Sequence, residues 1–80
     1  MVKRDKSGSE EGESPLKRLR EAAGLSQQEL ATRIGVAVAT ISRWERGASP
    51  AMMSVPQMRA LCKALGISFE ELPDHFGPPT

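Results

Sequence analysis

The spacing of small and apolar residues from Gln27 to Trp44 constrains the fold of this 80-residue chain more than any other feature. Ala31 follows Gln27 by four residues, and Gly35 follows Ala31 by four more, which fits a short helix ending at a glycine. Gly35 suits this place because a sharp turn between helices needs a positive φ. Ile41 and Trp44 are three residues apart and supply an apolar face for a second helix. The stretch therefore predicts two short helices that cross closely at Ala31.

Start and stop signals predict further helices along the chain. Three serines are followed three residues later by an acidic or amide side chain, as in a capping box: Ser26 with Glu29, Ser54 with Gln57, and Ser68 with Glu71. Glycines follow the expected helix ends at Gly24, Gly35, Gly47 and Gly66, and no stretch shows the sustained alternation typical of a strand. We expect an all-α, compact bundle of five helices at residues 15–23, 27–34, 37–46, 55–65 and 69–74.

Apolar residues at helical spacing predict the buried faces of these helices. They are Leu16, Leu19 and Ala23, then Leu30, Ala31 and Ile34, then Met58, Leu61, Cys62 and Leu65, and at the end Phe69, Leu72 and Phe76. Cys62 is expected to be a buried small hydrophobe. One cysteine and one histidine cannot form a zinc site, and no nucleophile has a base partner. No metal, cofactor, small-molecule substrate or enzyme activity is therefore expected.

Composition sets the expected limits of the domain. Residues 1–13 contain only two apolar side chains and are expected to form a disordered tail, as is the short stretch 77–80. Residues 14–76 then form one domain. The basic start is not followed by an apolar run, so no signal peptide is expected, and no segment is apolar enough to span a membrane. These features predict a cytoplasmic protein.

The formal net charge is only +1, but the charges are unevenly distributed. Residues 14–47 carry six basic and three acidic side chains. Residues 1–13 and residues 48–80 each carry one more acidic than basic side chain. The positive excess therefore lies on the two-helix motif, which favours a negatively charged partner there.

With these motifs, the chain resembles the phage repressor and Cro family of helix-turn-helix proteins, the XRE-like group. The resemblance covers residues 16–74 and rests on the strings LKRLREAAGLSQQELATRIGV, ISRWERG and MRALCKALGISFEEL. It implies a bundle of the lambda-repressor-like DNA-binding type, which usually binds double-stranded DNA as a dimer on a two-fold operator. The second helix of such a motif enters the major groove, so we expect the helix at 37–46 to do so.

Helical spacing divides the helix at 37–46 into two faces. Ala37, Thr40, Ile41 and Trp44 share one face, and Val38, Ala39, Ser42, Arg43 and Arg46 share the other. The resemblance implies that Val38, Ala39, Ser42 and Arg43 face base edges and that Gln27 contacts phosphate. Arg43 is the best candidate to bind a base, because its guanidinium fits guanine O6 and N7, with a phosphate contact as the alternative. Thr40 and Arg46, at the two ends of the helix, are further candidates for phosphate contacts.

Two features qualify this interpretation. The helix starts with the apolar run VAVA, and Ala37 removes the usual Ser or Thr cap. Either the operator is read mainly through one arginine plus DNA shape, or the helix has a protein-binding use.

The resemblance also implies that Arg20 and Glu45 form a structural ion pair between the first and third helices.

The predicted function is a sequence-specific, double-stranded DNA-binding transcriptional regulator. The alternative is a protein-interaction module on the same fold, such as an antitoxin or co-regulator. A domain this small contacts few base pairs, so we expect a weak homodimer on an inverted repeat. Phe69, Leu72 and Phe76 are candidates for its contact, although burial within the protomer is the favoured place for Phe69 and Leu72.

Overall fold

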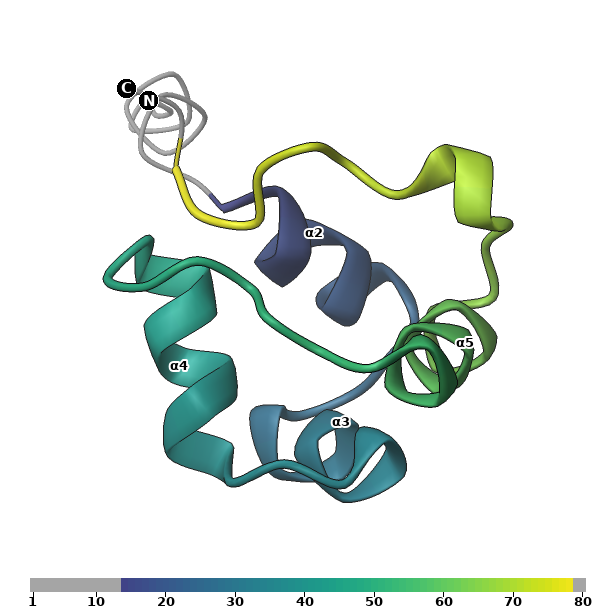
Figure 1. Ribbon diagram of the computed structural model, residues 1–80, viewed down its shortest axis with the longest axis horizontal. Coiled ribbons are helices and arrows are strands. Elements are labelled where there is room, and N and C mark those ends of the chain that lie inside the picture. The colour runs from purple at the N-terminus through teal and green to yellow at the C-terminus, as the bar shows by residue number, and fades with distance from the viewer. Residues whose placement is uncertain (1–13, 79–80) are drawn as a thin grey trace, which may run out of the picture.

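The computed structural model describes residues 14–78, which form four α-helices and one 3₁₀ turn (Figure 1). These are α2 (Pro15–Ala22), α3 (Gln27–Ile34), α4 (Val38–Arg46), α5 (Val55–Leu65) and η1 (Phe69–Glu71). No strand occurs in the described part of the chain, which confirms the all-α prediction for these residues. None of the helices found there is long and apolar enough to cross a membrane. The tail expected at residues 1–13 lies outside the described residues, as do residues 79–80.

The helix ends follow the local signals in the sequence. Ser14 caps α2 by accepting a hydrogen bond from a backbone N–H, and Pro15 occupies the first helical position. The capping boxes at the starts of α3 and α5 are both formed. Gly35 ends α3 at a φ of 80°, and Gly47 ends α4 at a φ of 74°. Because these signals act within one turn of the chain, they place the helices without reference to the rest of the fold.

The core lies where α2, α3, α4 and α5 meet. Its buried apolar side chains are Leu16, Leu25, Leu30, Ala31, Ile34, Ile41, Trp44, Leu61 and Leu65. Ala31 is fully buried, as expected of a small residue where helices approach closely. The ring of Phe76 packs edge-on to Trp44 with the ring centroids 6.2 Å apart. The C-terminal segment thus closes the core over α4.

The expected fifth helix at residues 69–74 is wrong. Only Phe69–Glu71 are helical, as one 3₁₀ turn, and Leu72 is extended at φ −65° and ψ 134°. Pro73 explains this end, because a proline disfavours the helical conformation of the residue before it. The short turn leaves the side chain of Phe69 66% exposed, where burial was the favoured expectation, while Leu72 packs against the core.

Two other expectations about burial need correction. Cys62 is half-buried, and Ala23 is exposed as the C-cap residue of α2.

The packed chain also continues past residue 76, because Gly77 and Pro78 lie against Gly47 at the end of α4. Figure 1 shows this last segment running from η1 past α2 towards that end of α4. These contacts join residues about thirty positions apart, which local signals cannot predict.

Candidate nucleic-acid interface

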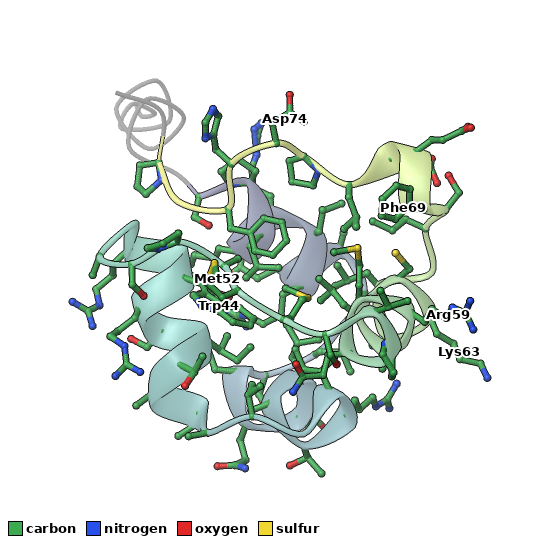
Figure 2. The ribbon with its side chains drawn as sticks, viewed as in Figure 1. Trp44, Met52, Arg59, Lys63, Phe69 and Asp74 are labelled. Atoms are coloured by element: carbon green, nitrogen blue, oxygen red, sulfur yellow. The ribbon has the colours of Figure 1, made fainter. Side chains whose placement is uncertain are left out.

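α4 presents one side to solvent and the other to the core. Figure 1 shows α4 at the left edge of the domain, with α3 beside its first turns. Ile41, Trp44 and Glu45 are buried on its inner side. The residues predicted to face DNA take up the rest of its surface: Val38, Ala39, Arg43 and Arg46 are exposed, and Thr40 and Ser42 are half-buried. In Figure 2, nitrogen-tipped side chains project from this outer side, away from the body of the domain.

The two arginines of α4 lie along its outer surface. The guanidinium of Arg43 donates to the Thr40 hydroxyl at 3.4 Å, and Nε of Arg46 donates to the Ser42 hydroxyl at 3.3 Å. Both hydrogen bonds are long and exposed, so they are weak. A guanidinium carries five N–H donors, and each arginine therefore keeps donors for an oxygen or nitrogen acceptor on a ligand.

The first turn of α4 has no side-chain cap. Ala37 is the N-cap residue, with extended φ and ψ of −71° and 149°, and no side chain accepts a hydrogen bond from the turn. The N-terminal end of the helix therefore carries partial positive charge without a side-chain acceptor. It stands next to the exposed side chains of Val38 and Ala39.

A buried ion pair fixes the last turn of α4 to α2. Arg20 Nε donates to Glu45 Oε2 at 2.6 Å, and a second guanidinium nitrogen donates to Oε1 at 3.2 Å. A third donates to the carbonyl of Leu25 at 2.9 Å. Arg20 and Glu45 are only 8% and 5% exposed. The hydrogen bond to Glu45 raises the pKa of the Arg20 guanidinium above its ordinary value, which favours its charged form further.

Gln27 joins the same cluster. Its side-chain Nε2 donates to Glu45 Oε1 at 2.9 Å, so one carboxylate binds side chains from both α2 and α3. The contact lies near the C-terminal end of α4, so Gln27 supports the last turn of that helix from α3. Nothing in the local sequence signals the contact, because the two residues are 18 positions apart.

A broad hollow of about 990 Å³ lies between the loop after α4 and the C-terminal segment. Met53, Met58 and Phe69 supply part of its apolar lining, and Glu70 and Asp74 carry its negative charge. None of the residues on the exposed side of α4 lines it. Its carboxylates disfavour phosphate, so the hollow and the basic outer side of α4 suit different partners.

The chemistry of the described residues is limited. No group of three or more His, Cys, Asp or Glu side chains within residues 14–78 is placed to hold a metal ion. The outer side of α4 carries guanidinium, hydroxyl and apolar groups, which are the kinds of group that contact base edges and phosphates in protein–DNA interfaces. Two crossed helices joined at Gly35, with a basic second helix exposed along one side, define a helix-turn-helix domain.

Comparison with protein families agrees with this geometry. The profile of the helix-turn-helix family matches residues 16–72, and the chain belongs to this family, in its XRE-like group. The members of the family are DNA-binding regulators of transcription, and the match gives this chain the same general assignment. Comparisons with curated proteins and with solved structures gave no match.

Proposed function

We propose that the protein is a sequence-specific, double-stranded DNA-binding transcriptional regulator that inserts α4 into the major groove. The observation that carries the proposal is the outer side of α4, which is exposed and basic while its inner side is locked to α2 and α3. A helix fixed in this way presents its side chains to DNA with little freedom to reorient. That rigidity is what direct recognition of base edges requires.

The proposed contacts divide between bases and phosphates. Val38, Ala39, Ser42 and Arg43 face base edges, and Arg43 donates to guanine O6 and N7. Thr40 and Arg46 contact phosphates at the sides of the groove. Gln27 contacts a phosphate through its second amide proton or its backbone N–H, since its first amide proton is held by Glu45. Arg20 and Glu45 act as a structural ion pair without touching DNA.

We propose that two copies bind an inverted repeat as a weak homodimer. Their recognition helices would lie about 34 Å apart on one side of the duplex. Phe69 is the proposed contact between copies because it is 66% exposed, whereas Leu72 and Phe76 pack against their own core. Sedimentation with and without duplex tests this, and Phe69→Ser should weaken pairing with no loss of melting temperature. If the variant pairs as well as the wild type, the contact is elsewhere.

A second candidate function is protein binding on the same fold, as in an antitoxin or co-regulator. The observation in its favour is the exposed apolar run at the start of α4, formed by Ala37, Val38 and Ala39. Such a run is suited to a protein partner as well as to a DNA groove. The charged residues that follow it, Arg43 and Arg46, favour DNA.

Selection of bound duplexes from a random pool tests the proposal. We expect enrichment of an inverted repeat. The logarithm of the binding constant should fall linearly with the logarithm of the salt concentration, because phosphate contacts release counterions. If no sequence is enriched and binding is insensitive to salt, the DNA proposal fails and protein binding becomes the function to pursue.

A further inference from the structure

The side chains of the three residues at the start of α4, Ala37, Val38 and Ala39, are all hydrocarbon. Val38 is 39% exposed, and Ala37 and Ala39 are exposed on either side of it. The nearest hydroxyls, on Thr40 and Ser42, are half-buried and already accept hydrogen bonds from arginines of the same helix. The side chains of Ala37, Val38 and Ala39 themselves can neither donate a hydrogen bond to a base nor accept one from it.

The major groove offers only one apolar group to such a surface. Base edges there carry hydrogen-bond donors and acceptors, except for the methyl group on C5 of thymine. Placing the isopropyl group of Val38 against a polar base edge removes water from that edge without replacing its hydrogen bonds, which is unfavourable. Placing it against a methyl group buries apolar surface on both sides.

From this chemistry we infer that Val38 recognises a pyrimidine 5-methyl group in the major groove. The inference rests on the proposed insertion of α4. The small side chains of Ala37 and Ala39 allow the helix to approach the base edges closely enough for van der Waals contact. Since Ala37, Val38 and Ala39 carry no hydrogen-bonding group, they bind the methyl group whichever polar base edge carries it. Thymine and 5-methylcytosine then present the same group to Val38, and unmethylated cytosine does not.

Replacing each thymine of the selected duplex by deoxyuridine tests this contact, because the change removes only the methyl group. We expect binding to weaken about fourfold at one position in each half-site, the ratio that corresponds to burial of one methyl-sized group. The Val38→Ala variant should lose this sensitivity at that position. The Arg43→Ala variant, altered one turn further along α4, should keep it. Helical content and melting temperature of both variants confirm that they are folded.

A second arm replaces the thymine·adenine pair at the sensitive position by cytosine·guanine, with and without a 5-methyl group on the cytosine. The methylated cytosine should recover most of the affinity that the unmethylated one loses. Recovery in the wild type and its absence in Val38→Ala would identify the methyl group as the feature that Val38 binds. If the methylated and unmethylated cytosines bind equally weakly, the polar edge is read and the inference is overturned.

The outcomes separate this inference from the proposed function. Selective duplex binding with no deoxyuridine effect at any position would overturn methyl recognition and leave the DNA-binding proposal intact. A deoxyuridine effect that persists in Val38→Ala would overturn the assignment to Val38. Failure to enrich any duplex would overturn the proposed function, and with it the inference that depends on it.

Discussion

Arg20 and Glu45 face each other across α2 and α4 in a two-pronged ion pair, with Nε and Oε2 only 2.6 Å apart. Glu45 lies one residue before the end of α4 and shares its carboxylate with Gln27 of α3. Three helices are thus joined at one buried group. An exposed carboxylate here would repel DNA phosphate. Buried against α2 and α3, the Glu45 carboxylate instead fixes the orientation of α4.

Arg20→Ala should destabilise the domain by about 3–5 kcal/mol, because it leaves the Glu45 charge buried without its main partner. It also removes the donor to the Leu25 carbonyl. Thermal and urea unfolding measure the loss, and DNA affinity should fall only in proportion to the unfolded fraction.

A double variant keeps this test informative if Arg20→Ala does not fold. Arg20→Met combined with Glu45→Met replaces the pair by apolar groups and should recover most of the stability. An Arg20→Ala protein that melts at the wild-type temperature yet no longer binds DNA would show that Arg20 contacts DNA, against the structural role.

Arg43→Ala should weaken binding to the preferred site by about 1–3 kcal/mol and relax the sequence preference at one position in each half-site. The matched control is Arg59→Ala, which removes the same charge from α5, across the domain from α4 in Figure 2. Anisotropy titrations with the selected duplex and with single-base variants measure both effects. An equal loss on every sequence would make Arg43 a phosphate contact.

Ala37→Ser should stabilise the domain by about 1 kcal/mol. Ala37 already has the extended conformation of an N-cap residue, and a serine hydroxyl there can accept a hydrogen bond from the first turn of α4. Ala22→Ser, in the exposed last turn of α2, is the control that adds a hydroxyl without a cap. Urea unfolding that shows no gain for Ala37→Ser over this control would mean that the turn is already satisfied.

The acid sensitivity of the domain should depend in part on Glu29. The backbone N–H of Ser26 donates to the Glu29 carboxylate at 2.8 Å, and this hydrogen bond, together with the Ser26 side chain, holds its pKa below the ordinary value of 4.5. A lowered pKa in the folded state gives stability that is complete above the unfolded value and is lost as pH falls through the folded value. Below about pH 4.5, wild type should therefore lose stability faster than Glu29→Gln, which keeps the capping box. Parallel acid slopes for the two proteins would contradict this.

Helix starts and helix ends, which depend on residues close together in the sequence, were predictable from the sequence. The capping serines and Gly35 placed α3 and α4 because each signal acts within a single turn. Pro73 also signalled the end of η1. The prediction of a longer helix gave more weight to the apolar spacing of Phe69 and Leu72 than to this proline. The exposure of Phe69 follows from that shortened turn.

Contacts between distant segments were not predictable in the same way. The hydrogen bond from Gln27 to Glu45 and the packing of Gly77 against Gly47 both depend on how finished helices meet. For the candidate site, helical periodicity predicted which side of α4 is exposed. It did not predict that Thr40 and Ser42 would be held by hydrogen bonds from the arginines one turn away.

Methylation protection of the selected duplex by dimethyl sulfate tests the insertion of α4 most directly. The reagent attacks guanine N7 in the major groove and adenine N3 in the minor groove, so it reports which groove is occupied. We predict protection of one guanine N7 in each half-site, about one helical turn apart, with no protection of adenine N3. This protection should disappear in Arg43→Ala and persist in Arg59→Ala. Protection confined to adenine N3, or binding that leaves every guanine N7 reactive, would contradict the placement of α4 in the major groove.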